Sequence, residues 1–379
     1  MAVERLLPTE EARDLIELTR EIADKVLTPI VDEHERAETY PEGVFATLGA
    51  AGLLSLPYPV EWGGGGQPYE VYLQVLEEIA ARWAAVAVAV SVHSLSCHPL
   101  LAFGTEEQKQ RWLPDMLGGS LIGAYSLSEP QAGSDAAAVA CRATPGDGGY
   151  RINGTKAWIT HGGIADFYNL FARTGEGSRG ISCFLVPRET PGLTFGKPEA
   201  KMGLHAVPTT TAHYDDAFLP EESRIGAEGQ GLQIALSALD SGRLGIAAVA
   251  TGLAQAALDE AVAYAKERTA FGRPIIDHQG LGFLLADMAA AVDSARATYL
   301  DAARRRDAGL TYSRQASVAK LIATDAAMKV TTDAVQVYGG YGYTRDFRVE
   351  RYMREAKITQ IFEGTNQIQR LVISRALAH

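Results

Sequence analysis

Residues 150–160 read YRINGTKAWIT, and this stretch decides the fold class of the chain. At its centre, Asn153 and Gly154 tolerate the positive φ angles of a type I′ turn, so residues 150–152 and 156–159 are predicted to be two strands joined by that tight turn. The alternating stretch 181–186 and the segment 211–218 predict further strands, separated by Gly and Pro. The middle third of the chain is therefore predicted to be rich in β-structure.

The residues before this part have helical periodicity. Thr9 is a candidate N-cap that precedes acidic residues, and apolar residues follow it at helical spacing, namely Leu15, Leu18, Ile22 and Val26. The glycine run 63–66 interrupts the pattern, and a second helix is expected from about Tyr69. The run lacks a preceding strand and the Lys-Ser/Thr of a phosphate loop, so we interpret it as a connector.

Helical periodicity returns after Gly231. One apolar stripe consists of Leu281, Leu284, Leu285, Met288, Val292, Ala295 and Tyr299, and part of another consists of Val318, Leu321, Ile322 and Met328. The order of helices, small β domain and helical bundle is α+β and disfavours a Rossmann sheet. We predict an N-terminal all-helical domain over 1–120, a middle β-barrel or β-sandwich domain over 121–228 and a C-terminal helical bundle over 229–379.

The composition argues against several classes of protein. A formal net charge of −11 disfavours nucleic-acid binding, and the longest basic cluster, 304–306, fits a solvated helix face. The first eight residues lack the features of a signal peptide, and no apolar stretch, residues 83–92 included, is judged long enough to cross a membrane. The three separate cysteines fit a cytoplasmic protein. Cys97 beside His98 lacks a second pair, so we expect a buried thiol and no metal site.

Residues 125–135, YSLSEPQAGSD, are the first segment that indicates chemistry. Gly133 lets a ligand approach the backbone closely, while Ser128 and Ser134 offer hydroxyl groups to a polar ring edge or a phosphate oxygen. Composition alone slightly favours an ordinary Ser/Pro/Gly loop.

Together with three later segments in the same order, this segment resembles the acyl-CoA dehydrogenase family. The later segments are 153–160 (NGTKAWIT), 267–272 (ERTAFG) and 361–370 (IFEGTNQIQR), and the resemblance extends to about Arg375. It implies an oxidoreductase with a helical domain, a β domain and a four-helix bundle, in which FAD lies between the β domain and the bundle.

The resemblance implies which residues surround FAD. Those expected at the isoalloxazine and beside it are Tyr125, Leu127, Ser128, Gly133, Ser134, Trp158, Ile159 and Thr160, with Thr365 and Gln367 at further contact positions. The Ser128 and Thr160 hydroxyls would bond the polar edge of the ring. On periodicity alone, Trp158 is equally a core residue of the predicted hairpin.

The adenine dinucleotide end of FAD is expected to reach a neighbouring subunit. Arg268 would pair with the pyrophosphate, a role that suits a forked guanidinium, and Phe271, Gln279, Gln336, Gly339 and Gly340 fall at the other contact positions. Alone, the glycines at 339 and 340 resemble a weak dinucleotide loop, but they follow a helix and are interpreted as its end. The shared FAD implies a dimer, and family analogy implies a homotetramer built as a dimer of dimers.

The resemblance also implies the thioester site. Asp240 and Arg243 are expected near the pantetheine and acyl group, Ser134 near the CoA phosphate, and Phe362 and Gly364 at the acyl pocket. Without the resemblance, Asp240 and Arg243 are an ordinary i, i+3 surface ion pair.

Glu363 is implied as the base that removes the α proton. Its backbone N–H and a ribityl hydroxyl of FAD would hold the thioester carbonyl, a sealed pocket would raise the pKa of its carboxyl, and the β hydrogen would pass as hydride to flavin N5. Some relatives carry the base just before the arginine of the earlier helix, a position that is Gly242 here. Outside the signature, a Glu before a Gly-Thr turn is commonly an exposed residue.

The implied partners are an acyl-CoA of short or medium chain and an electron-transfer flavoprotein, as in fatty acid β-oxidation, with no nucleic acid and no membrane. Two alternatives stay open: a flavin oxidase or monooxygenase of the same fold, and a non-enzymatic binding relative. Glu363 disfavours the first alternative, and the acidic charge disfavours a nucleic-acid form of the second.

Overall fold

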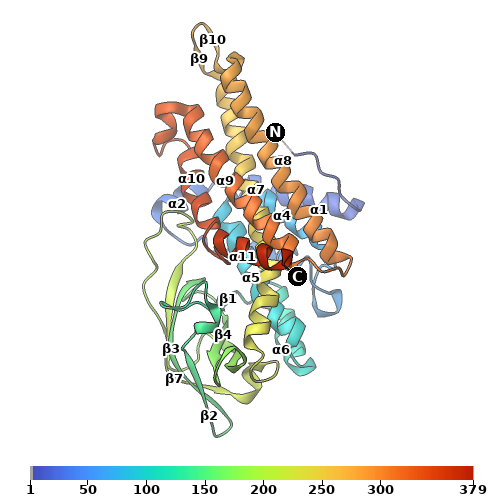
Figure 1. The fold of residues 1–379 in the computed structure, drawn as a ribbon, viewed down its shortest axis with the longest axis vertical. Helices are drawn as coiled ribbons and strands as arrows, with labels where there is room; N and C mark the ends of the chain where they lie inside the picture. Colours follow the sequence, from blue (N-terminus) through green and yellow to red (C-terminus); the bar gives the residue numbers. More distant parts are fainter. Residues whose placement is uncertain (1–2, 379) are drawn as a thin grey trace.

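The computed structural model describes residues 3–378 and begins with helices (Figure 1). They are α1 (Glu10–Ile22), α2 (Val31–Ala37), α3 (Val44–Ala50), α4 (Tyr69–Ala80), α5 (Ala84–Phe103) and α6 (Glu106–Leu117). Thr9 caps α1 as predicted, because its hydroxyl accepts a hydrogen bond from the Ala12 N–H at 3.1 Å. The glycine run lies in the connector before α4, also as predicted.

Within the described residues, the middle of the chain forms one mixed eight-stranded sheet. Its strands are β1 (Gly123–Ser126), β2 (Arg142–Gly146), β3 (Gly149–Thr160), β4 (Phe167–Arg173), β5 (Ile181–Pro187), β6 (Leu193–Phe195), β7 (Thr209–Pro220) and β8 (Arg224–Ile225). They pair in the order β6-β7-β3-β2-β4-β5-β8, and β1 joins β4 in parallel. The strands predicted at 181–186 and 211–218 are confirmed as parts of β5 and β7.

The predicted hairpin around Asn153 is wrong. β3 runs through both predicted strands without a turn, and its pairing with β7 shifts register at Gly154. Gly154 has a φ of 151°, so the glycine permits a bulge within a long strand instead of a turn between two strands. The two-residue turn lies earlier, at Asp147 and Gly148, where β2 joins β3.

The C-terminal part is helical, as predicted. It consists of α7 (Gly231–Glu267), α8 (Gln279–Asp307), α9 (Ser313–Tyr338), α10 (Val349–Thr359) and α11 (Asn366–Leu377), with a small tip of β9 (Thr269–Ala270) and β10 (Arg273–Pro274) between α7 and α8. The predicted α8 stripe is buried or packed against the core.

The predicted apolar stripe of α9 is confirmed in part, because Ile322 and Met328 pack against the core. Val318, Leu321, Ile322 and Met328 are only half-buried, whereas the fully buried face carries Ala316, Ala319, Ala323 and Ala327. The distance between packed helices depends on the side chains at their contact, and alanine permits the closest approach. α9 therefore packs along α7 with a face that is rich in small residues.

Two helices are long and apolar enough to cross a membrane, contrary to the sequence prediction. They are α5, with a mean hydropathy of 1.6, and α7, with a mean hydropathy of 1.3. Within the most apolar window, 78% of α5 and 72% of α7 is buried inside the protein. A core helix can have the same length and composition as a membrane-spanning helix. Because most of each window is covered by the chain itself, α5 and α7 fit core helices.

α5 and α7 connect the sheet to the other helices (Figure 1). The sheet lies at one end of the molecule, and the β9–β10 tip lies at the opposite end of α7. A buried charge cluster fixes α4 in the helical part: Glu77 accepts a hydrogen bond from Arg296 at 2.9 Å, lies 3.1 Å from Arg5 and bonds the hydroxyl of Tyr299. A buried carboxylate requires such partners, so these contacts hold three segments in one arrangement.

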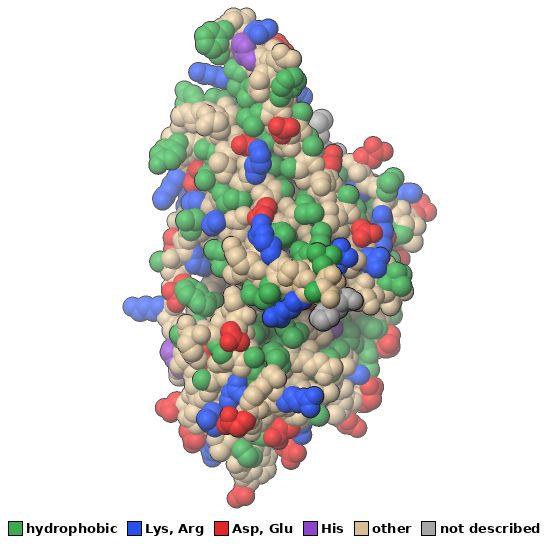
Figure 2. Space-filling model, in the orientation of Figure 1, with side chains coloured by type: hydrophobic (Ala, Val, Ile, Leu, Met, Phe, Trp, Pro, Cys, Tyr) green, Lys and Arg blue, Asp and Glu red, His purple; other side chains and the backbone are tan. Residues whose placement is uncertain are grey.

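Acidic and basic side chains are interspersed on the face seen in Figure 2. The arginines at 304–306 only partly match the predicted solvated face. Arg304 is half exposed and pairs with Glu70 at 2.8 Å, whereas the guanidinium of Arg306 lies 3.8 Å from the centre of the Tyr69 ring. Arg306 therefore turns toward the interior, where cation–π contact compensates part of its desolvation.

Replacing Gly154 with Ala is expected to destabilise the fold by about 1–3 kcal/mol. A Cβ at this position would lie 2.7 Å from the Cα of Cys141, and neither backbone segment can move without disturbing strand pairing. Gly146→Ala is the matched control, because a Cβ there meets nothing within 4 Å. Urea unfolding of both variants measures the difference, and equal stabilities would contradict the bulge as a packing constraint.

Candidate active site

Glu363 lies in the loop between α10 and α11, and the local sequence explains the shape of that loop. Thr365 caps α11 by accepting a hydrogen bond from the Ile368 N–H at 3.2 Å. Glu363 has a φ of 49° and Gly364 has a φ of 86°. A non-glycine residue in the left-handed region is uncommon, and such strain clusters at functional sites. Two other residues of this segment have expected roles: Phe362, expected at the acyl pocket, is half-buried, and Gln367, expected to contact FAD, is exposed.

The carboxylate of Glu363 is buried, although the residue as a whole is partly exposed. Neither of its oxygens accepts a hydrogen bond from any residue within 3–378. Burial raises the pKa of this carboxyl to about 7, and the positive charges of Lys320 and Arg243 oppose the rise. The backbone N–H of Glu363 also donates to no residue in the described chain. A weakly solvated carboxyl group and a free amide donor therefore belong to the same residue.

Glu363 projects over Gly242 of α7. A Cβ built on Gly242 would lie 2.2 Å from Oε2 of Glu363 and 3.3 Å from Cδ1 of Leu95. Only glycine leaves room for the carboxylate at this level of the helix. Gly242 stands at the position where some relatives are expected to carry the base, and it faces Glu363, the residue expected to be the base in this chain.

Lys320 reaches the same loop from α9 and was missed from the sequence. Its Nζ donates to the Gly364 carbonyl oxygen at 2.8 Å and to Oδ1 of Asn366 at 3.1 Å. The side chain is fully buried, and burial lowers the pKa of its ammonium to about 8 although the negative charge of Glu363 opposes this. A lysine at helical spacing from Ala316 and Ala323, on the alanine-rich face of α9, was the available signal for a buried charge.

Asp240 and Arg243 form a largely buried pair, so the surface pair that their spacing allowed is wrong. Arg243 Nη1 donates to Oδ1 of Asp240 at 2.6 Å, and the Ser313 hydroxyl donates to the same oxygen at 3.0 Å. Arg243 is 5% exposed, and its Nε has no hydrogen-bond partner among residues 3–378. Because Arg243 directly follows Gly242, the pair holds a positive charge beside the buried carboxyl group of Glu363.

A small cavity of about 30 Å³ adjoins Gly242. Its lining includes Tyr58, Tyr69, Tyr72, Ser94, Leu95, His98 and Arg306. The Tyr69 hydroxyl donates to the Ser241 carbonyl oxygen at 3.0 Å, and the Tyr58 hydroxyl donates to the Ser94 carbonyl oxygen. These bonds fix the phenol rings, so the cavity beside Gly242 is small and has rigid walls.

Segment 125–128 and strand β3 bring together most of the residues expected at the flavin ring. The Ser128 carbonyl accepts a hydrogen bond from the Ala157 N–H at 2.8 Å, which holds the two segments side by side. Trp158 is 64% exposed with a φ of 62°, so the core position that periodicity allowed is wrong. Thr160 lies two residues further along β3 and is half-buried, as is Ser128. An exposed indole beside two hydroxyl groups fits a flavin ring and its polar edge.

The other residues expected near the ring are less uniformly placed. The Ile159 side chain is 1% exposed and packs in the sheet core, which leaves only its backbone for a cofactor. The Tyr125 hydroxyl donates to the Ala235 carbonyl of α7 at 3.2 Å, and Leu127 is buried. Gly133 and Ser134 are exposed. A Cβ on Gly133 would meet nothing within 4 Å, so packing within the chain does not require glycine there.

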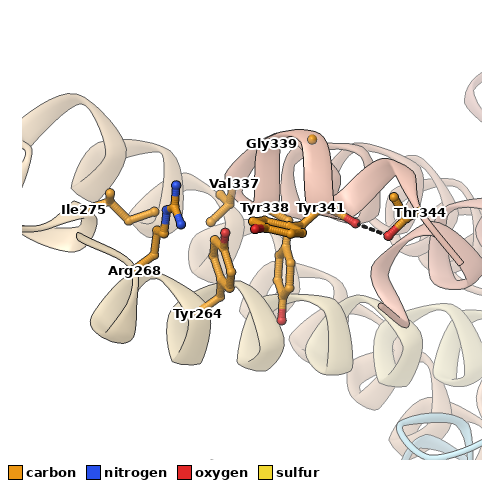
Figure 3. Close-up of a pocket in the computed structure, with 9 residues that line it drawn as sticks. Tyr264, Arg268, Ile275, Val337, Tyr338, Gly339, Tyr341 and Thr344 are labelled. Carbon is orange, nitrogen blue, oxygen red and sulfur yellow. Dashed lines mark hydrogen bonds between the residues drawn. The ribbon is translucent and has the colours of Figure 1, made fainter. Parts of the chain in front are cut away.

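Residues expected at the adenine dinucleotide lie at the other end of α7 (Figure 3). A hollow of about 510 Å³ is lined by Tyr264, Arg268, Ile275, Val337, Tyr338, Gly339, Gly340, Tyr341 and Thr344. The Arg268 guanidinium lies 5.9 Å from the centre of the Tyr341 ring, and Tyr264 stacks on Tyr338 with ring centres 4.0 Å apart. α9 ends at Tyr338, so the predicted helix end at Gly339 is confirmed. Phe271, Gln279 and Gln336 are exposed.

These two groups of residues are far apart within one chain. The residues expected at the flavin ring lie on or beside the sheet, where α7 begins, and Arg268 follows the last residue of α7. A helix of 37 residues is about 55 Å long at roughly 1.5 Å per residue. One chain therefore does not bring both groups to a single dinucleotide.

Comparison with known proteins identifies the class of fold and site. Models of the acyl-CoA dehydrogenase N-terminal, middle and C-terminal domains match residues 9–120, 124–217 and 229–378. An acyl-CoA dehydrogenase of Bacillus subtilis is 45% identical over 372 residues, which cover 97% of this chain and 98% of that protein. This chain belongs to the acyl-CoA dehydrogenase family.

Two solved structures share the whole fold. Butyryl-CoA dehydrogenase from Megasphaera elsdenii is 40% identical with a TM-score of 0.97, covering 99% of this chain and 100% of that chain. A chain in the structure of the electron transferring flavoprotein of Acidaminococcus fermentans is 43% identical with a TM-score of 0.97, covering 99% of both chains. Acyl-CoA dehydrogenases are FAD flavoproteins and oxidoreductases that act on CH–CH bonds, so FAD is the cofactor of this chain.

Replacing Gly242 with Ala is expected to lower the rate of flavin reduction by a short-chain acyl-CoA about 100-fold, because the new methyl group must displace the Glu363 carboxylate and an error of about 1 Å has this effect. Gly280→Ala is the matched helix control, since a Cβ there meets nothing within 4 Å. Anaerobic stopped-flow absorbance gives both rates. A Gly242→Ala enzyme as fast as the control would contradict the contact between the two residues.

Proposed function

We propose that this protein catalyses α,β-dehydrogenation of a short-chain acyl-CoA to the trans-2-enoyl-CoA, with Glu363 as the catalytic base. One observation carries the proposal: the carboxyl group of Glu363 is buried over Gly242 without a hydrogen-bond partner in the described chain, and its pKa is raised to about 7. A carboxyl group in this state is a far better base near neutral pH than one in water.

The α proton of a thioester is weakly acidic, so the site must also stabilise the developing enolate. The free backbone N–H of Glu363 is a suitable donor for the thioester carbonyl, and it is fixed by the same loop as the base. Arg243, held by Asp240, adds a positive charge near the reacting atoms. An acyl group bound beside Gly242 would exclude water from the carboxyl group, which strengthens these interactions.

FAD would lie with its ring against Trp158, Ser128 and Thr160, and it supplies the acceptor for the β hydrogen as hydride. Arg268 and the glycines at 339 and 340 would hold the dinucleotide end of a neighbour's FAD. Their distance from the ring-facing residues of the same chain supports a dimer as the smallest complete unit. A homotetramer built from two such dimers completes the proposal by family analogy.

The same proposal includes an electron-transfer flavoprotein as the electron acceptor, a place in fatty acid β-oxidation and a cytoplasmic location. The likeness to a chain in the structure of an electron transferring flavoprotein supports the acceptor. Three free cysteines, all buried, are compatible with a reducing compartment. The butyryl-CoA and short-chain relatives support a short acyl substrate.

Glu363→Gln is expected to lower the rate of flavin reduction by butyryl-CoA by about 10²–10⁴-fold while leaving FAD bound, because the amide cannot accept the α proton. The unmodified enzyme should lose rate as the pH falls below about 7, since protonation of Glu363 removes the base. Anaerobic stopped-flow reduction across a pH series measures both effects.

Glu106→Gln is the control, because Glu106 is exposed on α6 and pairs with Lys109 at 2.9 Å. A Glu363→Gln enzyme that still oxidises butyryl-CoA at the control rate would refute the assignment of the base. Air added after reduction separates the oxidase alternative: slow reoxidation supports the dehydrogenase, and rapid peroxide formation supports an oxidase.

Among straight-chain substrates, kcat/KM is expected to fall about tenfold or more from butyryl-CoA to octanoyl-CoA, because the cavity beside Gly242 is small and its tyrosines are fixed. Leu95→Ala should move the preference toward longer chains, since Leu95 lines that cavity. Leu113→Ala, which removes an equally buried leucine away from the cavity, is the control. An optimum at long chains in the unmodified enzyme would contradict the cavity as the acyl pocket.

A further inference from the structure

Lys320 is a buried cation whose hydrogen-bond partners are all neutral. Its Nζ donates to the Gly364 carbonyl and to Asn366 Oδ1, and among residues 3–378 it forms no ion pair within 4 Å. Replacing such a buried charge with an apolar side chain of similar volume is often neutral or stabilising. Packing alone therefore gives little reason for a lysine at this position of α9.

The two bonds of Lys320 fall on the loop that carries Glu363. Gly364 directly follows Glu363, and its carbonyl also accepts a hydrogen bond from Nε2 of Gln369 at 2.8 Å. Asn366 is the first residue of α11, and its Nδ2 donates to Asp325 of α9 at 2.8 Å. Lys320 thus ties both the left-handed turn at Gly364 and the start of α11 to one helix.

Charged and titratable groups face Glu363 from several elements. Lys320 on α9 and Arg243 on α7 stabilise its negative charge. Tyr69 and Tyr72 on α4 and Tyr125 on β1 also interact with it electrostatically, but their burial raises the pKa of each phenol, so they are neutral near pH 7. Asp240 already binds Arg243 at 2.6 Å. Asp325 on α9 interacts electrostatically with Lys320, but within residues 3–378 no carboxylate forms an ion pair with Lys320 within 4 Å.

We propose that Lys320 is a positioning residue for the dehydrogenation: its ammonium group holds the Glu363–Gly364 turn against α9 and favours the ionised form of the catalytic carboxyl group. The inference rests on the proposed function, because it assigns a role relative to the base. Two effects of one group are separable, since hydrogen bonding needs only a donor whereas ionisation of Glu363 needs the positive charge.

Lys320→Met removes the donor and the charge, and Lys320→Gln keeps a donor without the charge. In both FAD-loaded enzymes, the acid limb of the pH profile for flavin reduction by butyryl-CoA should move upward by about one pH unit. At a pH below both limbs the rate should fall about tenfold, because that much less of Glu363 is ionised. The rate on the high-pH plateau should fall more for Met than for Gln, since only Met also releases the turn.

Lys329→Met is the control on the same helix, because Lys329 is exposed and pairs with Asp333 at 2.6 Å. Its profile should match that of the unmodified enzyme. Acid limbs that stay at the unmodified pH in both Lys320 variants would overturn the inference, and if the Met variant fails to fold, the Gln variant decides alone. An unmodified enzyme that no acyl-CoA reduces would instead refute the proposed function, and this inference with it.

Discussion

The burial of one unbonded carboxyl group, that of Glu363, is the constraint on which the site depends. Removing an ionised group from water is unfavourable unless charges or hydrogen bonds compensate. Here no residue in the described chain donates a hydrogen bond to it, and compensation comes from Lys320 and Arg243 at longer range. Such a group persists only because the surrounding helices fix it from outside: Gly242 removes the side chain that would collide with it, and the capped start of α11 fixes its backbone.

α7 runs from the sheet past the carboxyl group of Glu363 to the far end of the helical part. Its first residues pack on the sheet, Gly242 and Arg243 lie beside Glu363, and Arg268 follows its end beside the β9–β10 tip. A continuous helix is stiff over this length, so the distance between the flavin-facing sheet and the tip is fixed by the fold. The alanine-rich face of α9 lets the helix that carries Lys320 approach α7 closely. The distances between Glu363, its two cations and the residues expected to contact FAD therefore depend on α7 and α9.

The sequence predicted the α+β order and the main helices, because those signals are local in the chain, whereas Glu363 was implied by the resemblance of segment 361–370 to the family. The Asn153-Gly154 hairpin failed for a physical reason: a glycine with positive φ serves a bulge as well as a turn, and only pairing with β7 distinguishes them. Trp158 was ambiguous because alternation does not show which face of β3 is covered. Lys320 was missed because its partners lie more than 40 residues away, and periodicity gives burial but not contacts.

The raised pKa of Glu363 also explains why two cations, and not a direct ion pair, surround it. A general base works best when its pKa lies near the working pH, since a lower value weakens the base and a higher value leaves it protonated. Burial alone pushes the pKa of a carboxyl group upward, whereas a contact ion pair opposes that rise by stabilising the ionised form. Lys320 and Arg243 act on Glu363 without bonding to it, so their opposing effect is partial. The carboxyl group is held at a pKa of about 7 because its stabilisation is incomplete.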